Sequence, residues 1–235
     1  WAIFTVPIII FMPEPKIRKN VSFYDAIIGG FNQLKETFDN IREMKIIGTF
    51  LIAFWMYEDG VATIVRMAAK IASSLGFAAS DIITAILMVQ FIGFPAALGY
   101  NWFAKKIGTK NAVLVAILGY VVITFLGYLM TDITHFYILA ALIGLFQGGI
   151  QSLSRSLFTR LVPPNKEAEF FGFYNMLGKF AAVVGPILVG WITVLTGNPR
   201  AGILSIVVLF IFGGLLLSRV DFKEGERIAL EFGEN

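Results

Sequence analysis

Two acidic residues, Glu58 and Asp59, stand side by side in the segment Tyr57–Val61 (YEDGV), inside a long apolar stretch. A charge near the centre of a bilayer costs roughly 2.5–3.5 kcal/mol on insertion scales, so such residues usually face a cavity or a partner. Neighbouring helical positions point about 100° apart, so one carboxyl can titrate while the other pairs with a base. We therefore predict a role for Glu58 and Asp59 in coupling or gating; a structural polar network between helices is the alternative.

A second polar group recurs at helical spacing further along the chain. Gln147, Gln151 and Arg155 lie at positions i, i+4 and i+8 and so share one helix face. Amides inside a membrane hydrogen-bond either a substrate or a neighbouring helix. We predict that Gln147 and Gln151 line a pathway, and that Arg155, near the end of its segment, is a gate or an anchor.

Asn175 and Lys179 lie one helical turn apart in the next apolar segment. We predict a substrate contact for Asn175, while Lys179 either holds an anionic group or anchors the helix at the membrane surface. Gly185 and Pro186 follow, and because proline removes a backbone hydrogen bond, they predict a kink that could act as a hinge.

The composition indicates what must position these side chains. Of 235 residues, 57% are hydrophobic and only 15% are charged, and the mean hydropathy is +0.77. The apolar residues form runs of about 20, the length that a helix needs to cross a bilayer. This predicts an all-α, polytopic membrane bundle and excludes a soluble enzyme or a nucleic-acid module, although the pI is about 9.1. With no cysteine and one histidine, we expect no metal site and no cofactor.

Six membrane spans are expected within residues 46–219. Residues 1–12 resemble the end of a truncated transmembrane helix, residues 13–45 a cytoplasmic loop with an amphipathic helix, and residues 220–235 a cytoplasmic tail. The predicted spans are Ile46–Ala69, Ile82–Phe103, Ala112–Met130, Phe136–Phe158, Phe171–Leu195 and Ala201–Leu217.

The basic residues predict the orientation of these spans. All of the nineteen lysines and arginines except Arg66, Lys70 and Arg200 fall on one side of the predicted topology. By the positive-inside rule that side is cytoplasmic, so both ends of the six-helix block are expected there.

A basic turn follows the second span, with the sequence NWFAKKIGTK (101–110). It resembles the loop signature G-x-x-x-D-R-x-G-R-K of the major facilitator superfamily. Asn101 stands where glycine is usual and Lys105 where aspartate is usual, while Lys106, Gly108 and Lys110 keep the pattern. The glycine permits a tight turn, and the bases suit helix ends and lipid headgroups.

The segments YEDGV and Gln151–Pro186 together resemble one branch of that superfamily, the fungal vacuolar amino-acid effluxers linked to autophagy and their bacterial relatives. The resemblance covers the chain as a C-terminal six-helix half. It departs from the expected pattern at Glu58, which replaces an amide and so adds a carboxyl group.

The resemblance implies a secondary active transporter that moves a small polar solute, with amino acids as candidates, by alternating access. Its partners would be the lipid bilayer, a missing N-terminal half, the solute and protons. Its membrane would be the plasma membrane in a bacterium or archaeon and the vacuolar membrane in a eukaryote.

Other functions stay open at this point. They are a free-standing six-helix protein, a sugar or organic-cation symporter, a lipid-moving or channel-like protein, and a membrane receptor or structural module. No phosphate-binding loop or catalytic triad is present in the sequence, so we expect neither an enzyme nor ATP hydrolysis by this chain.

Overall fold

The computed structural model describes residues 23–234, which form helices and no strands. Helix α2 covers Phe23–Glu43, where the sequence predicted an amphipathic helix. Of the described residues, those up to Glu36 belong to one compact unit and those from Thr37 onward to a second. The expected end of a truncated helix at residues 1–12 lies outside the described residues.

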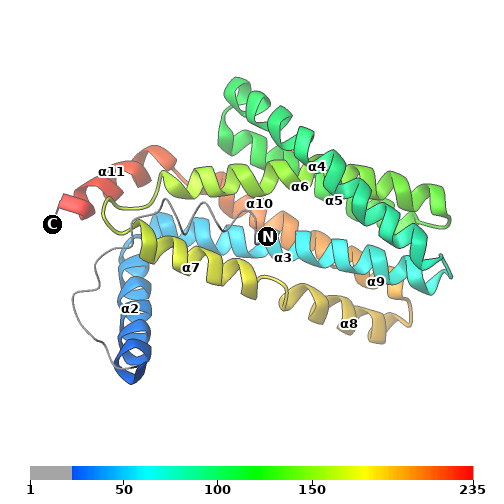
Figure 1. Ribbon diagram of the computed structural model, residues 1–235, viewed down its shortest axis with the longest axis horizontal. Coiled ribbons are helices and arrows are strands. Elements are labelled where there is room, and N and C mark those ends of the chain that lie inside the picture. The colour runs from blue at the N-terminus through cyan, green and yellow to red at the C-terminus, as the bar shows by residue number, and fades with distance from the viewer. Residues whose placement is uncertain (1–22, 235) are drawn as a thin grey trace, which may run out of the picture. The chain divides into compact units, whose positions relative to one another are not determined.

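The second unit contains the predicted bundle (Figure 1). Long helix α3 pairs with α10, while α4 packs along α6, and α5 lies against both α6 and α10. The helices after α2 are α3 (Lys45–Ser74), α4 (Ala79–Ile107), α5 (Thr109–Leu129), α6 (Ile133–Thr159), α7 (Glu167–Phe180), α8 (Val184–Thr196), α9 (Pro199–Leu204), α10 (Ile206–Arg219) and α11 (Phe222–Glu234).

Gly144 allows α6 to pack closely against α4. A Cβ atom at Gly144 of α6 would lie 2.9 Å from the carbonyl oxygen of Val89 in α4 and 3.1 Å from the Cβ of Ile92. Helices in membranes associate through such close contacts because lipid offers no hydrophobic driving force between them. A side chain at Gly144 would therefore push α4 and α6 apart.

Five helical segments in the described part of the chain are long and apolar enough to cross a membrane: α4, α5, α6, the α7–α8 pair and the α9–α10 pair. Helix α3 occupies the first predicted span and is 30 residues long. It is not among the five because Glu58 and Asp59 interrupt its apolar sequence.

The structure refines the prediction of a kinked span over residues 171–195, which lies within one membrane-length segment made of two helices. Helix α7 ends at Phe180 and α8 begins at Val184. Pro186 falls in the first turn of α8, where its missing N–H and fixed φ are tolerated, so the chain breaks before the proline rather than kinking at it. The sixth predicted span is also divided, at Ser205, whose hydroxyl donates a 2.6 Å hydrogen bond to the carbonyl of Gly202.

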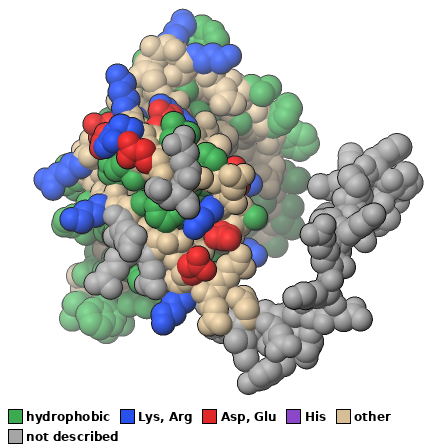
Figure 2. All heavy atoms as spheres, turned by 90° about the vertical axis from the view of Figure 1, so that its left-hand side faces the viewer, with side chains coloured by type: hydrophobic (Ala, Val, Ile, Leu, Met, Phe, Trp, Pro, Cys, Tyr) green, Lys and Arg blue, Asp and Glu red, His purple; other side chains and the backbone are tan. Residues whose placement is uncertain are grey.

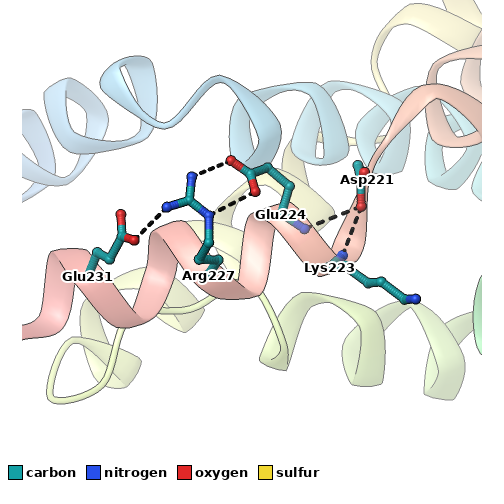
Figure 3. A network of polar contacts seen from close by, with 5 residues as sticks. All are labelled: Asp221, Lys223, Glu224, Arg227 and Glu231. Atoms are coloured by element: carbon teal, nitrogen blue, oxygen red, sulfur yellow. Dashed lines mark hydrogen bonds and ion pairs between the residues drawn. The ribbon is translucent and has the colours of Figure 1, made fainter.

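The predicted tail after residue 220 contains an amphipathic helix, α11. Asp221 caps it by accepting hydrogen bonds from the backbone N–H groups of Lys223 and Glu224 at 3.0 and 3.2 Å. Arg227 bridges Glu224 and Glu231, each at 2.5 Å, on the exposed face (Figure 3). The hydrogen bond from Arg227 lowers the pKa of Glu224 below its ordinary value.

Helices α6 and α10 terminate at the same end of the bundle, and we name it the basic end. Lysine and arginine side chains surround it, with acidic side chains between them (Figure 2). Arg160, just after α6, forms a 2.5 Å ion pair with Glu226 of α11, and Lys110 donates hydrogen bonds of 2.7 and 2.9 Å to the carbonyls of Ser218 and Val220. These contacts join the helix ends to one another. The sequence predicts that this end is cytoplasmic.

Candidate functional site

A cavity of about 560 Å³ lies between α3, α6 and α7. Five residues that the sequence singled out share its wall, although they come from three separate helices: Glu58, Gln151, Arg155, Asn175 and Lys179. The remaining lining residues are Phe54, Ser152, Tyr174 and Gly178.

The cavity carries charges of both signs. The half-buried carboxylate of Glu58 interacts with the Gln151 side chain, while its Oε2 atom is buried without a hydrogen-bond partner. Arg155 and Lys179 are exposed, and neither forms an ion pair among the described residues. The guanidinium of Arg155 lies 5.1 Å from the ring centre of Phe171. Within one cavity, Glu58 can therefore still accept a hydrogen bond from a ligand, and Arg155 and Lys179 can still donate hydrogen bonds to it.

Aromatic side chains form a rigid wall beside these charges. Tyr174 stacks on Phe54 at 4.2 Å and on Phe158 at 4.7 Å between ring centres. Directly behind, the buried hydroxyl of Tyr57 donates a 2.7 Å hydrogen bond to Ser154 Oγ, which joins α3 to α6. The rings fix the spacing of the three helices and so fix the positions of the charged groups.

Asp59 points away from this cavity and is fully buried. Its Oδ2 atom accepts a 3.0 Å hydrogen bond from the N–H of Gly185, and its Oδ1 atom accepts one of 3.2 Å from the hydroxyl of Thr63. The N–H of Val184 also hydrogen-bonds to this carboxylate. Asp59 therefore satisfies the free N–H groups at the start of α8, where a helix dipole favours negative charge.

Gly185 lets the Asp59 carboxylate approach the backbone of α8. A Cβ atom at Gly185 would lie 2.8 Å from the Cβ of Thr63 and 2.9 Å from Asp59 Oδ1, too close for either. The predicted hinge pair, Gly185 and Pro186, thus lies at the start of α8, which is hydrogen-bonded to Asp59 of α3.

The exposed face of α6 is polar from the cavity to the basic end. Its exposed residues from position 151 onward include no apolar side chain: Gln151, Ser152, Arg155, Ser156, Thr159 and Arg160. A second cavity of about 560 Å³ runs along this face and shares Ser152 and Arg155 with the first. Helix α4 differs, since large hydrophobic side chains such as Phe91 and Phe94 are 79% and 74% exposed on it. In a membrane, α4 suits an apolar neighbour, whereas this part of α6 requires water or a polar partner.

Two groups of predicted residues lie elsewhere. Gln147 is one turn from Gln151 but does not line the cavity, and its Oε1 atom is buried without a partner. The predicted loop signature covers the last turns of α4, which contain Asn101 and Lys105, and the first turn of α5. Gly108 lies between the two helices with φ +88°. At the end of α4, the Nζ atom of Lys106 lies 3.6 Å from the ring centre of Trp102.

Sequence reasoning left four lining residues out of the candidate set. Phe54 precedes Glu58 by one helical turn, and Ser152 and Tyr174 adjoin Gln151 and Asn175. Helical spacing could have found Phe54, while Gly178 carries no chemical signal of its own. Among the described residues there is no group of three His, Cys, Asp or Glu side chains that could hold a metal.

Apolar membrane-length helices around one charged, water-accessible cavity are typical of polytopic membrane transporters. The chain belongs to the family described as vacuole effluxer Atg22 like, whose model matches residues 1–230.

Individual relatives agree with this assignment. The chain is 35% identical over 220 residues to an uncharacterized MFS-type transporter, YxiO, of Bacillus subtilis, covering 94% of this chain and 51% of the relative. It is 27% identical to autophagy-related protein 22 of Coccidioides immitis, covering 100% of this chain and 43% of the relative. The protein of the same name from Cryptococcus neoformans is 28% identical, with 100% and 44% coverage. The chain thus spans about half the length of the curated relatives that it matches.

Proposed function

We propose that this chain forms the C-terminal six-helix side of a secondary active transporter that moves amino acids by alternating access. The observation that carries the proposal is the cavity between α3, α6 and α7, which presents Glu58 opposite in charge to Arg155 and Lys179. A zwitterion needs both signs within one site: an acid for its ammonium group and a base for its carboxylate.

The same lining disfavours the other solutes considered. An organic cation would be repelled by Arg155 and Lys179, and a sugar has no charge for either of them to bind. The amides of Gln151 and Asn175 can hydrogen-bond the carboxylate or a polar side chain of the solute, while Tyr174 and Phe54 offer apolar contact and a ring face for the ammonium group.

The two acids receive separate roles in this proposal. Glu58, whose Oε2 atom lacks a partner, binds the ammonium group of the solute and takes up the coupled proton when the solute leaves. Asp59, whose acceptor positions are taken by Val184, Gly185 and Thr63, holds the α7–α8 break. Movement at that break would alternate access to the cavity, with Arg155 and the polar face of α6 forming the route toward the basic end.

The opposite wall of the site would come from six further helices. The relatives are about twice as long as this chain, and transporters built from two related halves bind solute between them. The bilayer, the other half, the solute and a proton are therefore the proposed partners, in a multi-pass membrane protein with its basic end in the cytoplasm.

Efflux of radiolabelled amino acids from proteoliposomes that contain the intact protein tests this function. We expect Glu58→Gln and Arg155→Gln each to lower flux at limiting solute by about tenfold or more, because each removes one charge-assisted hydrogen bond. Lys105→Gln, which removes a base outside the cavity, is the matched control and should transport normally. Equal flux in all three variants would refute the proposed site. Flux of a sugar or an organic cation in place of amino acids would refute the proposed substrate class.

A further inference from the structure

A separate cavity of about 520 Å³ opens beside a different face of α3. On α3 it is lined by Gly48, Leu51, Ile52 and Trp55, a stripe at helical spacing that excludes Phe54 and Glu58 of the polar cavity. Its other walls are Phe38 and Ile41 at the end of α2 and Phe173 and Leu177 of α7. We call this cavity the α3–α7 groove.

The lining of this groove is chemically unlike that of the polar cavity between α3, α6 and α7. Apart from Lys45 and Thr49 its lining is apolar, and it contains no acidic side chain. The hydroxyl of Thr49 already donates a 2.8 Å hydrogen bond to the carbonyl of Lys45, so the exposed ammonium of Lys45 is the polar group left for a ligand. Phe38 and Ile52 at the rim are 53% and 55% exposed. This lining suits a hydrocarbon chain with a negative group at one end.

The length of the groove matches one leaflet of a bilayer. Lys45 and Trp55 are ten residues apart on α3, which is about 15 Å along a helix. The hydrocarbon core of a bilayer is about 30 Å thick, so this distance spans the acyl chains of one leaflet. Lys45 stands at the start of α3, at the end that the sequence predicts to be cytoplasmic, where anionic lipids attract lysine.

We propose that the α3–α7 groove binds one acyl chain of an anionic phospholipid, with the lipid phosphate against Lys45 and the chain reaching Trp55. The bound lipid contacts both α3 and α7 from the membrane side. Its acyl chain is apolar, whereas the proposed solute is polar. This site is independent of the polar cavity, so it stands or falls separately from the proposed function.

Trp55 reports directly on the occupant of the groove. In a version of the intact protein that keeps Trp55 as its only tryptophan, fluorescence is measured in vesicles that contain about 10 mol% of phospholipid with brominated acyl chains, because bromine quenches on contact. We expect brominated phosphatidylglycerol to quench Trp55 about fivefold more than brominated phosphatidylcholine at this fraction. A version that keeps only Trp191, which is 71% exposed on α8, is the matched control and should be quenched equally by both lipids.

Two substitutions separate headgroup from chain. Lys45→Gln should abolish the preference for phosphatidylglycerol, whereas Lys105→Gln should leave it intact. Gly48→Leu places a side chain in the groove and should reduce quenching of Trp55 by both lipids. A Cβ atom at Gly48 would lie 3.5 Å from the carbonyl oxygen of Ile41, which is an ordinary van der Waals contact. Equal quenching of Trp55 by the two lipids, or a preference that survives Lys45→Gln, would overturn the proposal. Absence of quenching by either lipid would also overturn it and would mean that a protein segment fills the groove.

Discussion

Glu58 and Asp59 are neighbours in sequence with the same functional group, yet they serve different regions of the molecule. Glu58 faces the cavity between α3, α6 and α7 and keeps an oxygen without a partner. Asp59 faces the start of α8 and accepts hydrogen bonds from two backbone N–H groups and one hydroxyl. The turn of about 100° between adjacent helical positions produces this separation. A carboxylate whose acceptor positions are filled supports structure, and one with spare capacity can bind a ligand.

The largest effect is expected from removing the carboxylate that supports structure. Asp59→Ala leaves the N–H groups of Val184 and Gly185 and the hydroxyl of Thr63 without an acceptor, so we expect the unfolding free energy to fall by about 3 kcal/mol. Glu58→Ala leaves fewer groups unpaired and should lower it by less than about 1 kcal/mol. Denaturant titration of the intact protein in detergent measures both, and equal losses would contradict the comparison.

A methyl group on the partner of Asp59 should have the next largest effect. In Gly185→Ala the new Cβ meets Thr63 and Asp59, so overpacking should reduce the unfolding free energy by about 1–3 kcal/mol. Gly190→Ala on the same helix has nothing within 4 Å of its new Cβ and is the control. If the two alanines destabilise the protein equally, the close contact between α3 and α8 is wrong.

The polar face of α6 gives a third test, since the chain contains no cysteine and single cysteines can be introduced. A cysteine at Ser156 should react with a water-soluble thiol reagent about tenfold faster than one at Phe91 of α4, because the reactive thiolate requires water. Labelling rates in proteoliposomes measure this difference. Similar rates would show that α6 is as shielded from water as α4.

The smallest effect is expected at the basic end, far from both acids. The hydrogen bond from Arg160 lowers the pKa of Glu226 below its ordinary value of 4.5. This pair therefore stabilises the fold above that pH, and its contribution disappears as the pH falls through the lowered pKa. Glu226→Gln should cost less than about 1 kcal/mol at pH 7, since the pair is exposed, and nothing at the acidic limit. Melting curves of the two proteins at pH 7 and at a pH below the lowered pKa of Glu226 check this prediction. A difference in melting temperature that grows on acidification would contradict it.

Much of the fold could be predicted because membrane spans are recorded in apolar runs and in the distribution of bases. The grouping of Glu58 with Gln151, Arg155, Asn175 and Lys179 followed in part from polar residues inside those runs. The angle of about 100° between Glu58 and Asp59 follows from helix geometry, but which of the two faces the cavity could not be predicted, because that depends on how α3 rotates against α6 and α8. The break before Val184 was not predicted either, because Gly185 and Pro186 in the sequence indicate only a kink. The point at which α8 begins is explained by the position of Asp59, which the sequence does not give.

One measurement tests the division between the two acids most directly: the melting temperature of the intact protein with and without the amino acid that it transports fastest. A ligand at 100 times its Kd stabilises the folded state by about 2.7 kcal/mol, a rise of roughly 3 °C for an intact protein about twice as long as this chain. We predict that Glu58→Gln melts like the unaltered protein without ligand and shows about half of the rise or less, because a tenfold higher Kd leaves about 1.4 kcal/mol of ligand stabilisation. Asp59→Asn should melt at a lower temperature and still show the rise. A full rise in Glu58→Gln together with no rise in Asp59→Asn would contradict the account.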